Sequence, residues 1–336
     1  MERQVKRIGV LTSGGDAPGM NAAVRAVVRT AINHGIDCVG IRRGWNGLIN
    51  SDFIPLDAPS VSHIINKGGT MLYTARSEEF RTAEGRAKAL ATCKLLGLEG
   101  IVAIGGDGTF QGALALSRQA AQAGSRLQVV GIPATIDNDI GCSHYTIGFD
   151  TACNTAVECI DKLRDTMQSH ERCSVVEVMG RHAGYLALYV GISIGATAVL
   201  IPEHEVDFDR DVTEKIRRAR LAGTTHYMVV VAEGAGSAFR IAERIKEETG
   251  MDPRVTVLGH IQRGGTPTAR DRETASRMGY EAVMSLAQGR GNRIIATQDG
   301  RIVDLDMEEA LGMVKHFQMD RYEVLESLAN TRSTPL

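Results

Sequence analysis

The length and composition of the chain predict a globular protein of two domains. Its 336 residues exceed the size at which one hydrophobic core stops growing, so a single domain is disfavoured. Apolar residues make up 43% and charged residues 23%, an ordinary balance for a folded, soluble protein. The formal net charge of −2 argues against nucleic acid or an anionic membrane as the main partner.

The cysteines and the N-terminal region favour a cytoplasmic location. The chain has 6 cysteines, without a CxxC pair or zinc-ligand spacing, and most lie in or beside apolar runs, as buried free thiols do. This usage fits a reducing compartment. The first apolar stretch stops at Gly14, and no apolar run approaches the ~20 residues of a membrane span.

Short apolar runs alternate with longer amphipathic stretches along the chain. The predicted strands are Ile8–Thr12, Cys38–Ile41, Ile101–Ile104, Gln128–Ile132, Ser174–Val178, Thr197–Ile201, Met228–Ala232, Val255–Leu258 and Ile294–Thr297. The predicted helices are Met20–Asn33, Ala83–Leu96, Phe110–Ala123, Asp150–Met167, Asp209–Ala222, Phe239–Thr249 and Ala269–Ala287. The strands do not alternate with polar residues, as expected when both faces of a parallel sheet are covered. The pattern therefore predicts a doubly wound α/β architecture, with a domain pivot near Asp139–Tyr145.

Polar, often Gly-rich loops follow many of these strands. They come after Thr12, Ile104, Ile132, Val178, Ala232 and Leu258. Ligands of open α/β sheets bind at the carboxyl ends of the strands, so these loops together predict one binding crevice. Any one of them, taken alone, is equally well explained as a tight turn between strand and helix.

Three side chains follow the strand that ends near Ile132: Thr135, Asp137 and Asp139. If the extended backbone continues, a period of two places them on the same face. We interpret Asp137 as a general base towards an alcohol and Thr135 as a phosphate-holding hydroxyl. The structural alternative for Asp137 is an Asx turn.

Two Gly-rich loops are suited to holding phosphate. Gly14, Gly15 and Gly19 precede a predicted helix, whose N-terminus favours an anion. The loop Gly105–Thr109 offers Asp107 as a Mg²⁺ ligand between glycines. Lipid kinases and NAD kinases have similar GGDG turns, so this loop is not specific. The chain has no Walker A sequence and no clean GxGxxG.

Arginines supply the balancing positive charge. Arg76 and Arg181 are suited to neutralising a transferring phosphoryl group. A cationic set suited to a phosphorylated substrate consists of Arg172, Arg254, His260 and Arg263. Any single arginine is more often a surface residue, and for Arg254 the sequence leaves a surface role and a binding role equally open.

The motifs together resemble the bacterial 6-phosphofructokinase family. They are GVLTSGGDAPGMNA, IGGDGT, TIDNDI, YTIGFDTA, SVVEVMGR and VLGHIQRGG, in order from Ile8 to about Gly279. The resemblance implies a glycolytic, ATP-dependent kinase that phosphorylates the 1-hydroxyl of fructose 6-phosphate, giving fructose 1,6-bisphosphate and ADP. It also implies two doubly wound, mostly parallel-sheet domains with the active site in the crevice between them. The nucleotide-binding domain would comprise residues 1–139 and about 253–305, and the sugar-phosphate-binding domain about 140–252 and 306–336.

The same resemblance assigns roles to individual residues. The catalytic group would be Asp137 as base, with Thr135, Arg181 and Arg76 around the transferring phosphoryl group. Asp107 would hold Mg²⁺, with Asp139 nearby. The nucleotide site would comprise Gly15, Arg76, Ser77, Gly106, Asp107, Gly108 and Thr109. The substrate site would comprise Thr135, Asp137, Asp139, Met179, Gly180, Arg181, Glu233, His260 and Arg263. Arg172 and Arg254 would reach in from a neighbouring subunit of a homotetramer.

Three other functions are compatible with parts of this pattern. A pyrophosphate-dependent member of the family typically has Asp where this chain has Gly108 and Lys where it has Ala134. Gly and Ala leave the α-phosphate region of a nucleotide open, so we expect ATP as the donor. A lipid or NAD kinase would explain the GGDGT turn but not the MGR and HIQRGG motifs. A non-catalytic paralogue would be expected to lack Asp107, Asp137 or Arg181.

The resemblance also bears on regulation, because family members bind ADP or phosphoenolpyruvate at a basic site. This chain keeps Arg25, Arg29 and Arg164 but has Ala58, Ala222, Thr224 and Thr197 where the family has three cations and a carboxylate. We therefore expect weak regulation by these ligands.

Overall fold

The computed structural model describes residues 5–329 and divides them into two compact units. The first unit comprises the chain up to Ile136, Ile140–Thr151 and Arg263–Lys315. The second comprises Asp137–Asp139, Ala152–Gln262 and the chain from His316 onward. The ends of the predicted domain ranges, residues 1–4 and 330–336, lie outside the described residues.

The first unit is built on a seven-stranded sheet of order β11-β10-β5-β4-β1-β2-β3. Its strands are β1 (Arg7–Ser13), β2 (Asp37–Ile41), β3 (Phe53–Leu56), β4 (Gly100–Gly105), β5 (Gln128–Pro133), β10 (Arg293–Gln298) and β11 (Arg301–Asp306). The inner strands are parallel, and only β3 and β11 at the two edges pair antiparallel. Every residue of β4 is buried, as expected of a central strand covered on both faces.

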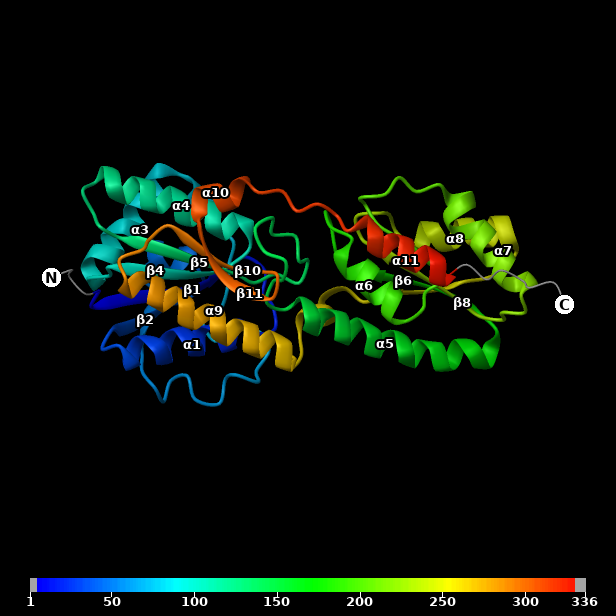
Figure 1. Cartoon of the computed structure of the whole chain (residues 1–336), viewed down its shortest axis with the longest axis horizontal. Helices are drawn as coiled ribbons and strands as arrows, with labels where there is room; N and C mark the ends of the chain where they lie inside the picture. The colour runs from blue at the N-terminus through cyan, green and yellow to red at the C-terminus, as the bar shows by residue number, and fades with distance from the viewer. Residues whose placement is uncertain (1–4, 330–336) are drawn as a thin grey trace. The chain divides into compact units, whose positions relative to one another are not determined.

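Helices cover both faces of this sheet. The helices of the unit are α1 (Met20–Asn33), α2 (Trp45–Ile49), η1 (Glu79–Arg81), α3 (Ala83–Leu96), α4 (Asp107–Gln122), α9 (Ala269–Ala287) and α10 (Met307–Gly312). Figure 1 shows α1 and α9 on one face and α3, α4 and α10 on the other. The boundaries of α3 follow from its ends: the Thr82 hydroxyl accepts the Gly85 N–H at 3.0 Å, and Gly97 ends the helix in the left-handed region.

The second unit contains a four-stranded, wholly parallel sheet of order β7-β8-β6-β9. Its strands are β6 (Cys173–Val178), β7 (Ala198–Leu200), β8 (Tyr227–Ala232) and β9 (Arg254–Val257). Its helices are α6 (Tyr185–Ser193), the π-helical turn η2 (Asp209–Thr213), α7 (Glu214–Leu221), α8 (Ala238–Thr249) and α11 (Met319–Ala329). Two helices span the division between the units: α5 (Phe149–His170) and η3 (Gly259–Arg263).

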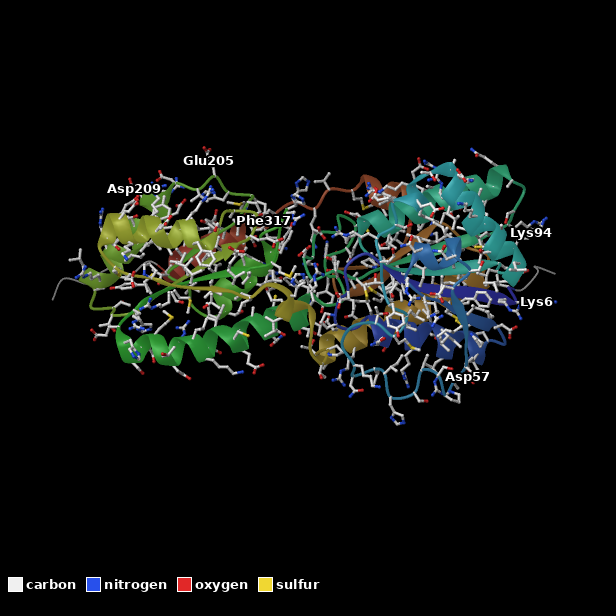
Figure 2. The ribbon with its side chains drawn as sticks, turned by 180° about the vertical axis from the view of Figure 1, so that it is seen from behind. Lys6, Asp57, Lys94, Glu205, Asp209 and Phe317 are labelled. Carbon is white, nitrogen blue, oxygen red and sulfur yellow. The ribbon has the colours of Figure 1, made fainter. Side chains whose placement is uncertain are left out.

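Apolar side chains from β6, β7 and β8 form the core of the second unit with α7 and α8. On α6, Tyr185 packs against Phe317, with ring centroids 5.1 Å apart. Phe317 is labelled in Figure 2, which also marks the exposed charged side chains of Lys94 and Glu205. Within residues 5–329, no helix is long and apolar enough to cross a membrane.

The predicted α/β class with mostly parallel sheets is confirmed, but some boundaries differ. The expected break near residue 253 would place the strand at Val255–Leu258 with the first domain. Instead β9 pairs with β6, because Ser174 lies opposite Arg254 in register, and the division between the units falls at Gln262. At the C-terminal side, α10 belongs to the first unit, since it packs against α4.

Candidate functional site

The loops after β1 and β4 lie side by side at the carboxyl edge of the large sheet. Ser13 and Gly105, the last residues of these two strands, are paired in register. A Cβ on Gly105 would collide with the Ser13 carbonyl oxygen and with the Thr109 side chain, so glycine is needed for this close approach. The two Gly-rich loops predicted to hold phosphate are therefore neighbours, as the sequence analysis expected.

The Gly105–Thr109 turn is the N-terminus of a helix. The expected start at Phe110 is wrong by three residues, because α4 begins at Asp107 with Gly106 as its N-cap. Asp107 and Gly108 are exposed there, and a Cβ on Gly108 would meet nothing within 4 Å. The positive end of the helix dipole therefore faces open space at Gly108, which is an arrangement that favours phosphate.

The segment that carries Arg76 is anchored to the same edge of the sheet. The Thr74 hydroxyl donates to the Gly14 carbonyl oxygen at 2.8 Å. The Ser77 hydroxyl oxygen accepts the Phe80 N–H at 3.2 Å and so leads the chain into η1. Arg76 between them is exposed, and the Thr74 hydrogen bond keeps this part of the backbone beside the first Gly-rich loop.

The Arg263 side chain packs against the first Gly-rich loop, and both belong to the first unit. Its guanidinium Nη1 donates to the Asp16 carbonyl oxygen at 3.0 Å. A Cβ on Gly15 would lie 2.8 Å from that nitrogen, so the absence of a side chain at Gly15 makes room for the guanidinium. Arg263 therefore brings positive charge to the loop that follows β1.

The chain does not stay extended after β5. The strand ends at Pro133, the backbone turns at Ile136–Asp137, and Asn138 adopts the left-handed region with φ 52°. The backbone is therefore not extended over this segment, and a period of two does not place Thr135, Asp137 and Asp139 on one face. Thr135 belongs to the first unit, whereas Asp137, half-buried, and Asp139, exposed, are grouped with the second.

Asp139 lies close enough to Tyr185 of α6 to influence its ionisation. Burial first, and then the carboxylates of Glu203 and Asp139, together raise the pKa of the Tyr185 hydroxyl to about 12. The Tyr185 hydroxyl therefore stays protonated, and so uncharged, at neutral pH beside the carboxylates of Glu203 and Asp139.

In the second unit, the loops after β6 and β8 are tied together by backbone hydrogen bonds. The Glu233 N–H donates to the Val178 carbonyl oxygen at 2.9 Å, and the Gly234 N–H donates to the Gly180 carbonyl oxygen at 3.2 Å. Arg181, next to Gly180, is exposed, as is Glu233. The structure thus brings the predicted substrate residues Met179–Arg181 and Glu233 together at the carboxyl edge of the small sheet.

Gln262 connects this pair of loops to the segment of His260, and the sequence analysis did not single it out. Its side chain is fully buried, and its Oε1 accepts the Met179 N–H at 2.8 Å. Its position inside the motif VLGHIQRGG was the available signal. His260, two residues earlier in η3, is exposed, so the third substrate loop is anchored to the first through a buried amide.

Arg172 and Arg254 lie at the other end of the same sheet. Arg172 immediately precedes β6, and Arg254 is the first residue of β9. With about 3.3 Å per residue, β6 separates this end from Met179 by roughly 20 Å. The lowered pKa of Asp252, caused first by Lys246 and further by Arg254 and Arg172, marks this end as a cationic cluster. These two arginines therefore do not join Arg181 and Glu233 within one chain.

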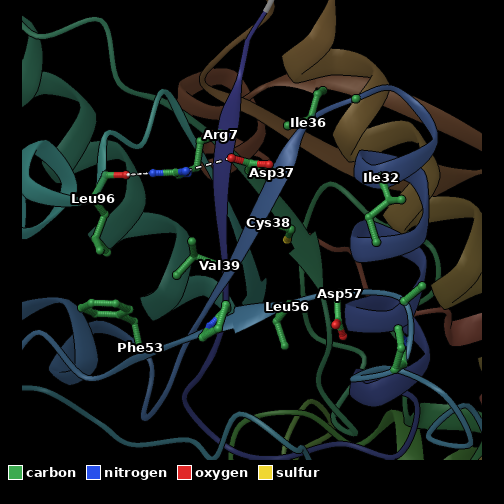
Figure 3. Close-up of a pocket in the computed structure, with 14 residues that line it drawn as sticks. Arg7, Ile32, Ile36, Asp37, Cys38, Val39, Phe53, Leu56, Asp57 and Leu96 are labelled. Carbon is green, nitrogen blue, oxygen red and sulfur yellow. Dashed lines mark hydrogen bonds and ion pairs between the residues drawn. The ribbon is translucent and has the colours of Figure 1, made fainter.

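A separate pocket lies at the edge of the large sheet. It has a volume of 810 Å³ and contains none of the predicted site residues. Figure 3 shows the Arg7 guanidinium at this pocket, where it donates to the Asp37 carboxylate at 2.8 Å and to the Leu96 carbonyl oxygen at 3.1 Å. Arg7 is the first residue of β1, so the pocket includes the amino end of that strand, opposite the Gly-rich loops.

Within residues 5–329, no group of three or more His, Cys, Asp or Glu side chains is arranged to hold a metal ion. Mg²⁺ that accompanies a nucleotide is commonly held by one or two carboxylates and the phosphates themselves. The exposed Asp107 carboxylate, beside the open space at Gly108, fits this second kind of site.

Sequence comparison matches residues 7–286 to the family Phosphofructokinase. The curated relatives include the ATP-dependent 6-phosphofructokinase of Clostridium botulinum strain Hall, 50% identical over 97% of this chain and 100% of the relative. The protein of the same name from Clostridium tetani has the same identity and coverage.

Solved structures agree with this similarity. The phosphofructokinase of Saccharomyces cerevisiae superposes with a TM-score of 0.89 at 33% identity, covering 96% of this chain and 50% of that chain. The pyrophosphate-dependent phosphofructokinase of Marinobacter aquaeolei gives a TM-score of 0.84 at 21% identity, over 99% of this chain and 93% of that one. The second likeness concerns the fold alone.

Proposed function

This chain belongs to the phosphofructokinase family, and we propose that it is an ATP-dependent 6-phosphofructokinase. It transfers the γ-phosphoryl group of ATP to the 1-hydroxyl of fructose 6-phosphate, giving fructose 1,6-bisphosphate and ADP. The observation that carries this proposal is the 50% identity to curated ATP-dependent enzymes over the full length of those relatives.

The nucleotide phosphates bind at the carboxyl edge of the large sheet. The N-terminus of α4 at Gly106–Gly108 presents the positive end of the helix dipole, and Gly15 on the neighbouring loop lets the Arg263 guanidinium approach. Asp107 would hold Mg²⁺, which neutralises charge on the β- and γ-phosphates when bound. Arg76 and Ser77 complete the nucleotide side.

Asp137 acts as the general base, taking the proton from the sugar hydroxyl. A neutral hydroxyl is a poor nucleophile, so a positioned carboxylate contributes roughly 10²–10⁴ in rate. Thr135, Arg76 and Arg181 stabilise the charge on the transferring phosphoryl group, which is the larger share of catalysis in this chemistry.

The sugar phosphate binds to Met179, Gly180, Arg181, Glu233, His260 and Arg263, with Asp139 near the base. Arg172 and Arg254 contribute from a neighbouring subunit. Their assignment to a neighbouring subunit is supported by their position at the amino ends of β6 and β9. Within one chain this position is roughly 20 Å from Met179 along the strand. A site completed in this way requires more than one copy of the chain, and a homotetramer meets that requirement.

The pyrophosphate-dependent alternative is not favoured. The pyrophosphate-dependent structures share only 21% identity with this chain. Ala134 is buried and its N–H donates to the Gly105 carbonyl oxygen at 2.9 Å, while Gly108 leaves open space. Neither position carries the long or charged side chain that would obstruct a nucleotide. A lipid or NAD kinase does not account for the family match over residues 7–286.

Other expectations about the protein stay predictions. We expect a cytoplasmic location, as the glycolytic reaction requires, and neither nucleic acid nor membrane as a partner. The first domain is expected to serve the nucleotide and the second the sugar phosphate.

A donor panel tests the proposal. Purified protein is assayed with fructose 6-phosphate, Mg²⁺ and ATP, GTP or pyrophosphate, and the product is identified by its phosphate positions. We expect the fastest turnover with ATP and a bisphosphate phosphorylated at positions 1 and 6. Faster turnover with pyrophosphate would reverse the donor assignment, and no turnover with any donor would indicate a non-catalytic paralogue.

A further inference from the structure

Asp271 is a buried carboxylate for which the proposed chemistry has no direct use. It lies in the first turn of α9 and is 0% exposed. It accepts hydrogen bonds from the Tyr145 hydroxyl, from the Gly148 N–H at 2.7 Å, and from both the N–H (2.9 Å) and the hydroxyl (2.5 Å) of Thr151. All four donors come from the segment 145–151, which joins the β5 loop region to α5.

Asp271 lies at the N-termini of two helices, where a carboxylate can accept several N–H groups. Its own N–H donates to the hydroxyl of Thr268, the N-cap of α9, at 3.3 Å. Gly148 and Thr151, whose N–H groups it accepts, flank the start of α5 at Phe149. Both helix dipoles favour negative charge at this point, so the carboxylate joins the start of α9 to the start of α5.

The same segment holds the backbone of Thr135. The Thr146 hydroxyl donates to the Thr135 carbonyl oxygen at 2.7 Å. Next to it, the Ile147 N–H donates to the Pro133 carbonyl oxygen at 3.1 Å, and Ile147 pairs with Ala134 as in a parallel sheet. Ile147 and its neighbour Thr146 thus hold the backbone just beyond the end of β5.

The segment also packs tightly against the first Gly-rich loop. A Cβ on Gly148 would lie 2.6 Å from the Ala17 Cβ, and a Cβ on Gly19 would lie 2.6 Å from the Ile147 Cγ2. Since neither side has free space, a displacement of this segment would also displace the loop between β1 and α1.

We propose that Asp271 is a positioning residue for phosphoryl transfer, acting through the segment Tyr145–Gly148 on Thr135 and on the turn that leads into Asp137. This inference rests on the proposed function, because it needs Thr135 and Asp137 to act on the substrates. Asp271 itself touches neither substrate in this account. Displacing a catalytic group by about 1 Å can cost on the order of 10²-fold in rate. A residue that fixes the position of this loop therefore has a large effect on kcat.

Three variants separate positioning from general stability. Asp271→Asn keeps the shape but replaces one acceptor oxygen by an NH₂ group that cannot accept. Thr146→Val keeps the shape and removes only the hydroxyl that holds Thr135, while Thr146→Ser retains that hydroxyl as the matched control. Steady-state kinetics with ATP and fructose 6-phosphate are measured together with circular dichroism and thermal unfolding.

We expect Asp271→Asn and Thr146→Val to lower kcat by about tenfold or more, with both KM values within about threefold of wild type, because the loss arises after binding. Thr146→Ser should restore most of kcat. A residue that only stabilises the fold would lower the melting temperature and leave kcat per folded enzyme unchanged.

The outcomes are distinguishable. Normal kcat in folded Asp271→Asn overturns the proposal, and so does normal kcat in Thr146→Val, whether or not Asp271→Asn folds. If Asp271→Asn fails to fold, a lowered kcat in Thr146→Val that Thr146→Ser restores supports it. Inactive wild-type protein would instead refute the proposed function itself.

Discussion

The Thr109 hydroxyl donates to the Ser13 carbonyl oxygen at 3.1 Å, in a buried contact between the first turn of α4 and the end of β1. Thr109 is 4% exposed, so water cannot readily replace this bond. The resemblance to phosphofructokinases assigns Thr109 to the nucleotide site, and its hydroxyl bonds the two Gly-rich loops to each other.

Thr109→Val should raise the KM for ATP several-fold and lower stability, with little effect on the KM for fructose 6-phosphate. Valine keeps the shape but leaves the Ser13 carbonyl without its donor, which costs roughly 1–3 kcal/mol. Steady-state kinetics and thermal unfolding measure both effects. Thr109→Ser, which retains the hydroxyl, is the control, and equal behaviour of the two variants would show that the hydroxyl has no such role.

Gly108→Asp should impair the use of ATP far more than the binding of fructose 6-phosphate. A Cβ at Gly108 meets nothing within 4 Å, so the fold should tolerate the side chain, while its charge repels nucleotide phosphates. The KM for each substrate and the melting temperature are compared with those of Gly108→Ala. An unchanged KM for ATP in a folded Gly108→Asp protein would show that the nucleotide does not bind at the N-terminus of α4.

Most of the fold was predictable from local pattern. The predicted helices Met20–Asn33 and Ala269–Ala287 coincide with α1 and α9, because their apolar residues recur at three- and four-residue spacing. The missed strands are edge strands: β3 contains Pro55, and three of the six residues of β11 are charged. The helix α6 was missed because it is apolar on nearly every face, which removes the periodic signal.

The candidate site was predictable in its residue types but not in its supports. Side chains after strand ends are visible in a sequence, and the structure places Asp107 and Glu233 at such ends. The burial of Gln262 and Asp271 depends on packing between segments far apart in the chain, and no local pattern reports it. The turn at Asp137 depends on the left-handed Asn138, a conformation that Asn adopts only in some contexts.

Four thiols should resist labelling in the native protein even at alkaline pH. The buried cysteines are Cys38, Cys93, Cys142 and Cys173. Burial raises the pKa of Cys38, Cys93 and Cys173 to about 12, from an ordinary value of 9.0. Burial also raises the pKa of Cys142, to about 11.

Because these native pKa values exceed the unfolded one, ionisation of the thiols favours the unfolded state once the pH passes about 9. A thiol-reactive chromophore at pH 8 should therefore label these four residues only after denaturation, which mass spectrometry of peptides can resolve. Denatured protein, in which all 6 cysteines react, is the control. Rapid native labelling of Cys38 or Cys173 would contradict the burial of these side chains in β2 and β6.

Regulation by phosphoenolpyruvate and ADP should be weak or absent. Each lost charge-assisted contact costs about 1.5–3 kcal/mol, so three missing cations exceed the roughly 1–3 kcal/mol of a typical allosteric coupling. The Thr197 hydroxyl, at the position of the missing carboxylate, already accepts the Met228 N–H at 3.2 Å. Rate curves against fructose 6-phosphate, with and without millimolar phosphoenolpyruvate, should nearly coincide and be close to hyperbolic. A several-fold shift in half-saturation that ADP reverses would refute this expectation.

The central claim is that Asp137 serves as the base in phosphoryl transfer from ATP to fructose 6-phosphate, and the kinetics of Asp137→Ser test it most directly. The variant should fold and bind both substrates, because Asp137 is only half-buried. Its kcat should fall by roughly 10²–10⁴ without a matching rise in either KM, as expected for an interaction made mainly in the transition state. Near-normal turnover of Asp137→Ser at neutral pH would contradict the account.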